Sequence, residues 1–600
     1  MILSTVLLAA SLAGHAAEPR VGAAEPQAGL RAADAEHAEA LRRRRGTFVT
    51  LAPFRLRSLD PAVAYDQGSF SVIANIYEPL LAFDGAPDRF KPWLASAVPS
   101  LANGGISADR RTYRFHLRSG VRFHEGGELT AEDARYSMLR EMLIETPGRP
   151  ASLLLRPLLG ADSALGPDGK WALEPEAVER AVRAEGGDLV FELRKPFPGF
   201  LAMIAARPVV TAKSWAVAQG DWDGRLPKPG DAPIQASEAL RFHSDGTGAY
   251  RLTRSTGDGR ELWLERFGGY WGRAPSFERV YVRAEPQGAM RAALLRDGEA
   301  DYAYMDRADA AALRGEKNVR VEDDLPNFAP GETLFMTLAL DAKDNPRLGS
   351  GKLDGAGIPA DFFRDVRVRE AFSLAFDARA YMREALGGKG TPAGGPIPRT
   401  LLHRRTARAY GYDPERAKAL LREAYGGELW KKGFRLVAAY PRGLPRRQVA
   451  AEILKRGVEA LNPAFKVEME GMRYPELERQ AWAHRLPVFV LSLAPDYPDA
   501  HAVAFEFFHS KGVFPRAQGI EDAELDRLEE EAAGEADPDV RTDKFARLQE
   551  LAGRRAYQIN TAYHPHVRAH CASLKGVRSG HCMCGLEFVN LLYWPSLSRE

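Results

Sequence analysis

Cysteine is scarce in this sequence. Three cysteines occur in 600 residues, Cys571, Cys582 and Cys584, and all lie near the carboxyl terminus. No cysteine is therefore available near the amino terminus to carry a lipid anchor. Because the number is odd, at least one thiol stays free in an exported chain unless it pairs with another chain.

The chain also lacks an excess of either charge. Its 82 lysines and arginines nearly cancel its 80 aspartates and glutamates. A balanced charge creates no overall field that favours nucleic acid, so we expect no nucleic-acid partner. The basic run at Arg42–Arg45 is typical of a solvated segment before the first strand.

Long apolar runs are missing as well. The most apolar stretch, Ile2–Ala13, is shorter than the roughly 20 residues that span a bilayer. It is followed by a small-x-small site at Gly14–Ala16, which is typical of a secretory signal peptide over residues 1–16, although basic residues are missing before it. We expect residues 17–45 to form a flexible extension, and the mature protein to be exported and soluble.

The common catalytic motifs are absent. There is no His-Glu-x-x-His, no Gly-x-Ser-x-Gly and no strand-bound Gly-x-Gly-x-x-Gly, and the spacing of Gly387–Thr391 does not match a phosphate-binding loop. Asp496 and Asp499 are too close in sequence to flank a sugar ring from opposite sides. These motifs therefore give no support to zinc-protease, hydrolase, nucleotide-binding or glycosidase chemistry.

A group of metal-binding residue types near the carboxyl terminus leaves two interpretations open. One is a metal site, and with it a metal-dependent hydrolase, built from His570, Cys571, His581, Cys582 and Cys584. The other is a pair of strands with exposed histidines and a disulfide between Cys571 and Cys582 or Cys584. The spacings match no standard zinc unit, which favours the second interpretation.

Strand and helix patterns alternate along the chain, which predicts an α/β fold. Thr130 and Asp133 form the pattern of a capping box before a helix that runs to Leu143. Asp413 precedes Pro414 as an N-cap precedes the first residue of a helix. Two amphipathic helices near the carboxyl terminus should be separated at Asp537-Pro538.

One stretch combines a buried strand with charge. Residues 486–494, LPVFVLSLA, form the nearly continuous apolar run of a strand covered on both faces. Asp496 follows, and ligands of open α/β sheets bind beyond the carboxyl ends of strands. Asp496 could therefore bind a cationic ligand or cap the next helix, and we favour the ligand; for Asp499 we favour the cap.

Six segments in this order resemble the family 5 extracellular solute-binding proteins of ABC importers, which bind dipeptides, oligopeptides or nickel. They are LDPAVAYDQGSFSVIANIYEPLLAFDG, TYRFHLRSGVRFHEGGELTAEDARYSM, GTGAYRL, VRVREAFSLAFDARAYM, YDPERAKALL and PDYPDAHAVAFEFFHSKG. The resemblance covers the chain from about Gly46 to its end.

The resemblance implies a periplasmic binding protein-like fold, with two hinged lobes around a cleft and an extra third domain (type II, cluster C-like). Carried onto this sequence, lobe I combines residues 46–95, 208–305 and 565–600. The extra domain fills residues 96–207, and lobe II fills residues 306–564. Pro208, in the segment Ala205–Val210, has the place expected of a crossing between domains.

The resemblance also implies a function and a site. A monomer in the periplasm would capture a short peptide and deliver it to the permease and ATPase of an importer in the inner membrane. Such a protein is not an enzyme and needs no cofactor. Asp496 matches the aspartate that pairs with the peptide's α-ammonium, and the main chain of Leu493 and Ala494 would bond to the peptide backbone. Tyr65, Glu78 and Tyr497 are further cleft candidates. Leu493 stands where some peptide-binding relatives have an aromatic residue, so a nickel chelate, haem or an opine-like compound remains an alternative ligand.

Overall fold

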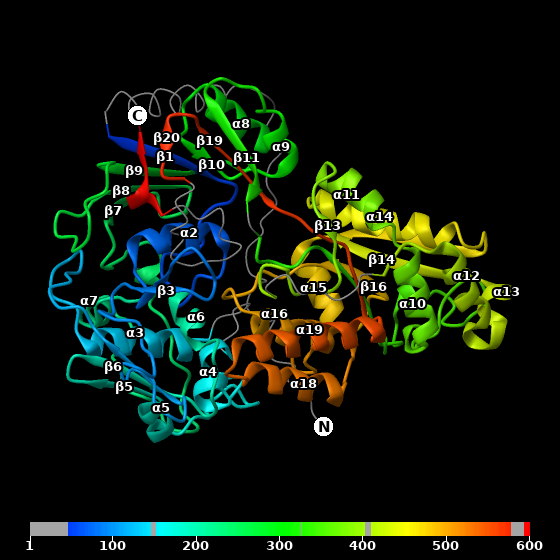
Figure 1. Cartoon of the computed structure of the whole chain (residues 1–600), viewed down its shortest axis with the longest axis horizontal. Coiled ribbons are helices and arrows are strands. Elements are labelled where there is room, and N and C mark those ends of the chain that lie inside the picture. The colour runs from blue at the N-terminus through cyan, green and yellow to red at the C-terminus, as the bar shows by residue number, and fades with distance from the viewer. Residues whose placement is uncertain (1–45, 146–151, 326, 403–409, 578–592, 600) are drawn as a thin grey trace.

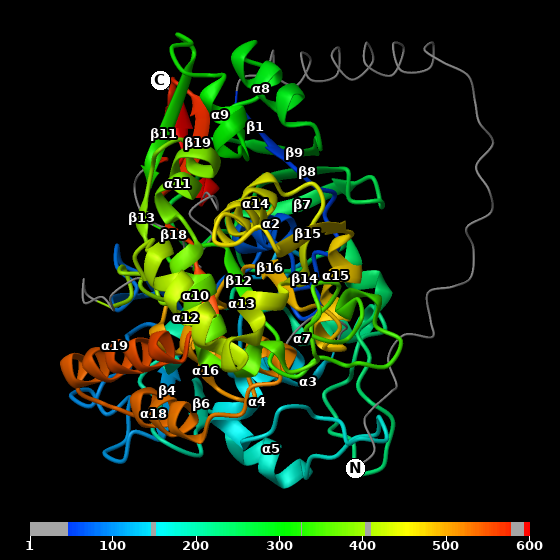
Figure 2. The ribbon, with the colours of Figure 1, turned by 90° about the vertical axis from the view of Figure 1, so that its right-hand side faces the viewer.

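The computed structural model describes residues 46–145, 152–325, 327–402, 410–577 and 593–599. The expected signal peptide, the expected extension over residues 17–45 and the basic run before Gly46 lie outside these ranges. In the described part, no helix combines the length and the apolar character that crossing a bilayer requires. Figures 1 and 2 show three bodies, which we call lobe I, the extra domain and lobe II.

Lobe I is built on a seven-stranded sheet in the order β11-β19-β10-β1-β9-β8-β7. The central strand β1 is parallel to both of its neighbours, and β19 is antiparallel to both β10 and β11. Helix α2 (Gln67–Ile76) packs against the sheet and carries the expected stripe of Val72, Ile73 and Ile76 in the core. Its strands are β1 (Thr47–Ala52), β7 (Tyr250–Ser255), β8 (Glu261–Arg266), β9 (Arg279–Ala284), β10 (Tyr302–Ala303), β11 (Val319–Leu325) and β19 (His566–Cys571). Its other helices are α8 (Gly288–Arg296) and α9 (Arg307–Ala311), and two short pairs complete it, β2 (Leu81–Phe83) with β3 (Phe90–Pro92) and β20 (Leu574–Lys575) with β21 (Ser598–Arg599).

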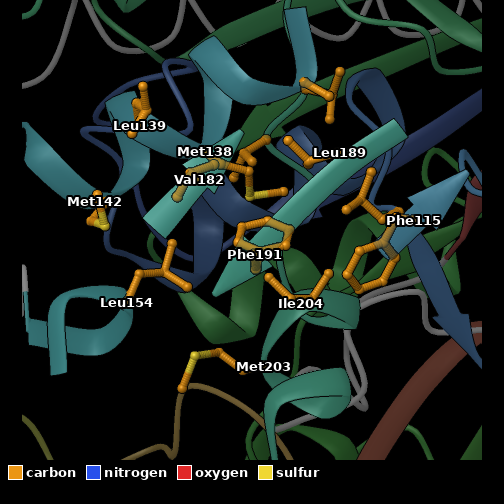
Figure 3. Packing of buried hydrophobic residues seen from close by; sticks show 14 of the residues in the cluster. Phe115, Met138, Leu139, Met142, Leu154, Val182, Leu189, Phe191, Met203 and Ile204 are labelled. Atoms are coloured by element: carbon orange, nitrogen blue, oxygen red, sulfur yellow. The ribbon is translucent and has the colours of Figure 1, made fainter. Parts of the chain in front are cut away.

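The extra domain has its own small sheet in the order β4-β6-β5. Side chains from the sheet and from helices around it meet in one apolar core, where Phe115, Phe191 and Ile204 lie close together (Figure 3). The same core continues to Leu80 and Leu81 of lobe I, so the extra domain is packed onto that lobe. Its elements are β4 (Thr112–His116), β5 (Val182–Glu185), β6 (Asp188–Glu192), α3 (Ala131–Leu143), α4 (Ser152–Leu159), α5 (Pro175–Ala181), α6 (Phe200–Ala205) and α7 (Lys213–Ala218). Helix α7 lies beyond the end expected at residue 207, because Ala216 packs against Tyr136 of α3.

Lobe II has a five-stranded sheet in the order β15-β14-β16-β12-β17. Strand β16 is parallel to β14 and antiparallel to β12, so it lies inside the sheet. The strands are β12 (Thr333–Met336), β14 (Phe434–Pro441), β15 (Phe465–Met472), β16 (Val488–Leu491) and β17 (Gln558–Asn560). The helices are α10 (Val366–Ala375), α11 (Ala378–Leu386), α12 (Pro414–Glu423), α13 (Glu428–Lys432), α14 (Pro445–Glu459), α15 (Tyr474–Trp482), α16 (Ala500–Phe508), α17 (Val513–Gln518), α18 (Ala523–Ala533) and α19 (Pro538–Arg555).

Two segments, which we call the crossings, connect lobe I with lobe II. One follows β11 and leads to β12, and the other follows β17 and leads to β19. The boundary expected at 305/306 is about 20 residues too early, because β11 still pairs with β19 in the sheet of lobe I. The crossings touch each other, since Thr561 donates from both its backbone N–H and its hydroxyl to the carbonyl oxygen of Glu332.

The local signals of helix termini are confirmed. Thr130 and Asp133 form both hydrogen bonds of a capping box at the start of α3. Asp413 caps α12 ahead of Pro414, and Asp537 caps α19 ahead of Pro538. Short polar side chains here bond to the free N–H groups of the first turn, which fixes where each helix begins.

Candidate functional site

The candidate site begins where β16 ends. The strand stops at Leu491, three residues before the end expected from the apolar run, and an irregular segment leads to α16. Within the described residues, the main-chain groups of Leu493 and Ala494 form no hydrogen bond. Half-buried backbone groups that are free of partners can bond to an extended ligand as a neighbouring strand would.

Asp496 lies at the meeting point of the two lobes. Its side chain is 22% exposed. The hydroxyl of Tyr65, from lobe I, donates to Oδ2 of Asp496 at 3.3 Å. The guanidinium of Arg207 donates to Oδ1 at 3.3 Å. Tyr65 and Asp496, two of the cleft candidates, thus lie in contact. A carboxylate with about four acceptor positions can still accept further donors.

Arg207 is a site residue that the sequence interpretation missed. It is buried, and it pairs with Glu141 of α3 at 3.3 Å as well as with Asp496. Burial disfavours its charge, but the two carboxylates outweigh that effect and raise the pKa of Arg207. An isolated arginine in the apolar segment MIAARPVV could have indicated it, because a buried charge needs a partner.

Asp499 has the structural role that its position predicted. It is the N-cap of α16 and accepts the backbone N–H of His501 at 2.8 Å. It also accepts both arms of the Arg541 guanidinium from α19, at 2.7 and 2.8 Å. Burial raises its pKa, but Arg541 outweighs that effect and leaves the pKa of Asp499 below its usual value.

A cavity of about 560 Å³ opens beside Asp496 and Tyr497. One wall comes from lobe II, with His501 and Phe505 on α16 and Glu529 on α18. The facing wall comes from the extra domain, through α4 and the segment before α6. Figure 1 shows α4 next to α16 and α18 at the lower centre of the molecule. The cavity has the size of a small-ligand site and contains both apolar and charged groups.

Glu78 lies away from this cavity. It is 1% exposed in lobe I, and its carboxylate accepts hydrogen bonds from four side chains: Trp93, Thr247, Tyr270 and Trp271. Burial raises the pKa of Glu78. A carboxylate enclosed by four donors fixes the surrounding loops of lobe I, and it offers no acceptor to the cavity that Asp496 borders.

The residues considered as metal ligands are only partly described. His570 and Cys571 lie on β19, where Nδ1 of His570 contacts the carbonyl of Cys571 and the thiol contacts Ser573. His581, Cys582 and Cys584 lie outside the described residues. Among the described residues, no group of three or more histidine, cysteine or acidic side chains could hold a metal ion.

The fold and the site define a class of protein. Two α/β lobes connected by two crossings, with an extra domain packed on one lobe, form the multi-domain fold of a periplasmic binding protein. A solved structure with this fold is the ABC transporter-associated periplasmic binding protein from Helicobacter pylori in complex with the peptide STSA. It has a TM-score of 0.69 and 19% sequence identity, and the match covers 92% of this chain and 98% of that one.

The chain belongs to the family described as bacterial extracellular solute-binding proteins, family 5 Middle, which it matches over residues 89–515. The dipeptide-binding protein of Escherichia coli K12 is 27% identical over 56% of each chain. The glutathione-binding protein GsiB of Pectobacterium atrosepticum is 24% identical over 69% of this chain and 70% of its own. The chain thus spans little more than half the length of the first of these relatives.

Proposed function

We propose that this protein is the solute-binding component of an ABC importer and captures short peptides. In this proposal the α-ammonium of the peptide binds Asp496, and the free main chain of Leu493 and Ala494 bonds to the peptide backbone. The observation that carries it is the position of Asp496, a partly exposed carboxylate beside both a cavity and unpaired backbone. Recognition through the backbone tolerates different peptide side chains.

Family membership supports the proposal, as do relatives named for binding a dipeptide and glutathione. The protein would work outside the cytoplasm as a monomer, and closure of the lobes would trap the ligand before it passes to the permease and its ATPase. No catalytic step is needed, because capture and release are changes of conformation. Tyr65 and Arg207 would position the Asp496 carboxylate across the gap between the lobes.

The test is titration calorimetry with free and N-acetylated dipeptides. Free dipeptides should bind, and their N-acetylated forms should not, because acetylation removes the charge that Asp496 pairs with. Asp496→Ala should weaken binding by at least about 100-fold, as expected for the loss of one partner of a buried ion pair. The control is Asp223→Ala, which removes an exposed carboxylate of the extra domain.

Two results would contradict the proposal. Equal affinity of wild-type protein for free and acetylated peptides would mean that the ammonium is not recognised. Wild-type affinity of Asp496→Ala, with an unchanged circular dichroism spectrum, would remove Asp496 from the site.

A further inference from the structure

Four ring side chains follow one another along the cavity wall of lobe II. Tyr497, His501, Phe505 and His509 are spaced by four residues and all border the cavity. Successive ring centroids lie 6.4, 5.9 and 4.7 Å apart, and successive ring planes differ by only 24°, 27° and 20°. Helix α16 carries His501 and Phe505, and Tyr497 and His509 flank its two ends. Because residues four apart lie on one face of a helix, the four rings form a continuous stack, which we call the ring ladder.

The facing wall adds groups that interact with rings. Phe197 of the extra domain meets His501 nearly edge-on, with centroids 4.9 Å apart. The guanidinium of Arg156, on α4, lies 4.0 Å from the ring centroid of Phe505. Both are favourable arrangements around aromatic rings. The cavity is therefore bounded on two sides by side chains suited to a flat, polarisable group.

The ladder carries little charge near neutral pH. The hydroxyl of Tyr497 lies 2.8 Å from Nδ1 of His501, and Oε1 of Glu529 lies 3.6 Å from its Nε2. Burial lowers the pKa of His501 to about 3 and raises that of Glu529 to about 8. A neutral imidazole and a protonated carboxyl group suit an uncharged guest beside the ladder, while charged side chains such as Arg156, Lys195 and Lys511 line other parts of the cavity.

From the ring ladder and the facing Phe197 we infer that this cavity is the subsite for an aromatic side chain in the first or second residue of the bound peptide. The inference rests on the proposed function, because Asp496 fixes the amino terminus of the peptide directly beside Tyr497. A cavity of about 560 Å³ has room for a side chain as large as indole. The protein then selects peptides by an aromatic residue near their amino terminus.

The experiment compares peptides that differ only in aromaticity. Ala-Phe and Phe-Ala are titrated against the same dipeptides with cyclohexylalanine in place of phenylalanine, which keeps a six-carbon apolar ring but removes its flatness and its π-system. Wild-type protein should bind at least one phenylalanine peptide about 5- to 10-fold more tightly than its cyclohexyl counterpart. Phe505→Leu and Phe197→Leu should each reduce that ratio toward one.

Phe54→Leu is the matched control, because Phe54 is an exposed ring of lobe I, and it should keep the wild-type ratio. Phe197 and Phe505 come from opposite walls, so the test remains decisive if one variant fails to fold. Equal binding of phenylalanine and cyclohexylalanine peptides would overturn this inference and leave the proposed function standing. Absence of binding by every free dipeptide would overturn both.

Discussion

Asp496 and Asp499 carry the same side chain three positions apart, yet their surroundings assign them different roles. Asp499 is enclosed by the first turn of α16 and by both arms of Arg541, so its acceptors are used inside the protein. Asp496 has two longer contacts, from Tyr65 of lobe I and from Arg207 at the end of the extra domain, and it stays partly exposed. The two roles differ because of position, since Asp496 borders the cavity and Asp499 does not.

Glu529, which lines the cavity, makes the stability of the folded protein depend on pH. Its pKa is raised by burial to about 8, so the folded protein binds a proton that the unfolded chain has already released above pH 4.5. Stability from this group is therefore present at low pH and is lost as pH rises toward 8. Between pH 6.5 and 8, the wild-type free energy of unfolding should fall relative to that of Glu529→Gln by up to about 1.4 kcal/mol per pH unit.

Urea unfolding of both proteins at half-unit pH intervals measures this difference. The comparison with Glu529→Gln isolates one group, because all other titrating residues are common to the two proteins. Parallel stability curves between pH 6.5 and 8 would show that Glu529 is already ionised in the folded protein.

At the scale of elements, the sequence predicted those features that depend on neighbours along the chain. The capping box of Thr130 and Asp133 and the break at Asp537-Pro538 are confirmed, because each is decided within one helical turn. The resembling segment VRVREAFSLAFDARAYM forms two helices, α10 and α11, and Asp377 caps the second.

The site was only partly predictable, because part of it depends on contacts between residues that are far apart in the sequence. Asp496 could be found because the end of an apolar strand is visible in the sequence. Its pairing with Tyr65 and Arg207 joins residues hundreds of positions apart, and no local pattern encodes such contacts. Glu78 was one of the cleft candidates, but no local pattern indicated the four donors that surround it.

The ion pair between Asp499, the N-cap of α16, and Arg541 of α19 allows a further test at the scale of elements. Asp499→Ala removes the cap of α16 and leaves the mostly buried Arg541 without its bidentate partner. We expect a loss of about 3–5 kcal/mol in the free energy of unfolding. Asp499→Asn keeps an N-cap side chain but loses the negative charge, so it should be intermediate.

Calorimetric melting of the three proteins checks this order. Equal melting temperatures for wild type and Asp499→Ala would mean that the ion pair contributes nothing to the packing of the two helices.

At the scale of the whole molecule, one buried ion triad fastens the extra domain to lobe I. Arg140 of α3 donates to both oxygens of Asp60, at 2.9 and 2.8 Å, and to Asp221 at 2.6 Å. All three side chains are almost completely buried. Arg140→Met should therefore destabilise the protein by at least about 3–5 kcal/mol, since it leaves two buried carboxylates without a cation.

Arg114→Met is the matched control, because Arg114 forms its ion pairs on the surface of the same domain, where such pairs contribute less than about 1 kcal/mol. Urea unfolding followed by circular dichroism compares the two. Similar unfolding midpoints for both variants would contradict a special role of the buried triad.

The contact between the two crossings bears on how fast a ligand can leave. A Cβ atom on Gly331 would lie 2.1 Å from the carbonyl oxygen of Ala562, so the two backbones pass each other with no space for a side chain. Two connections in such close contact cannot bend independently, and any rotation of one lobe against the other is shared by both. Under the proposed function, the residence time of a bound solute would therefore depend on the torsional stiffness of a few residues that never touch it.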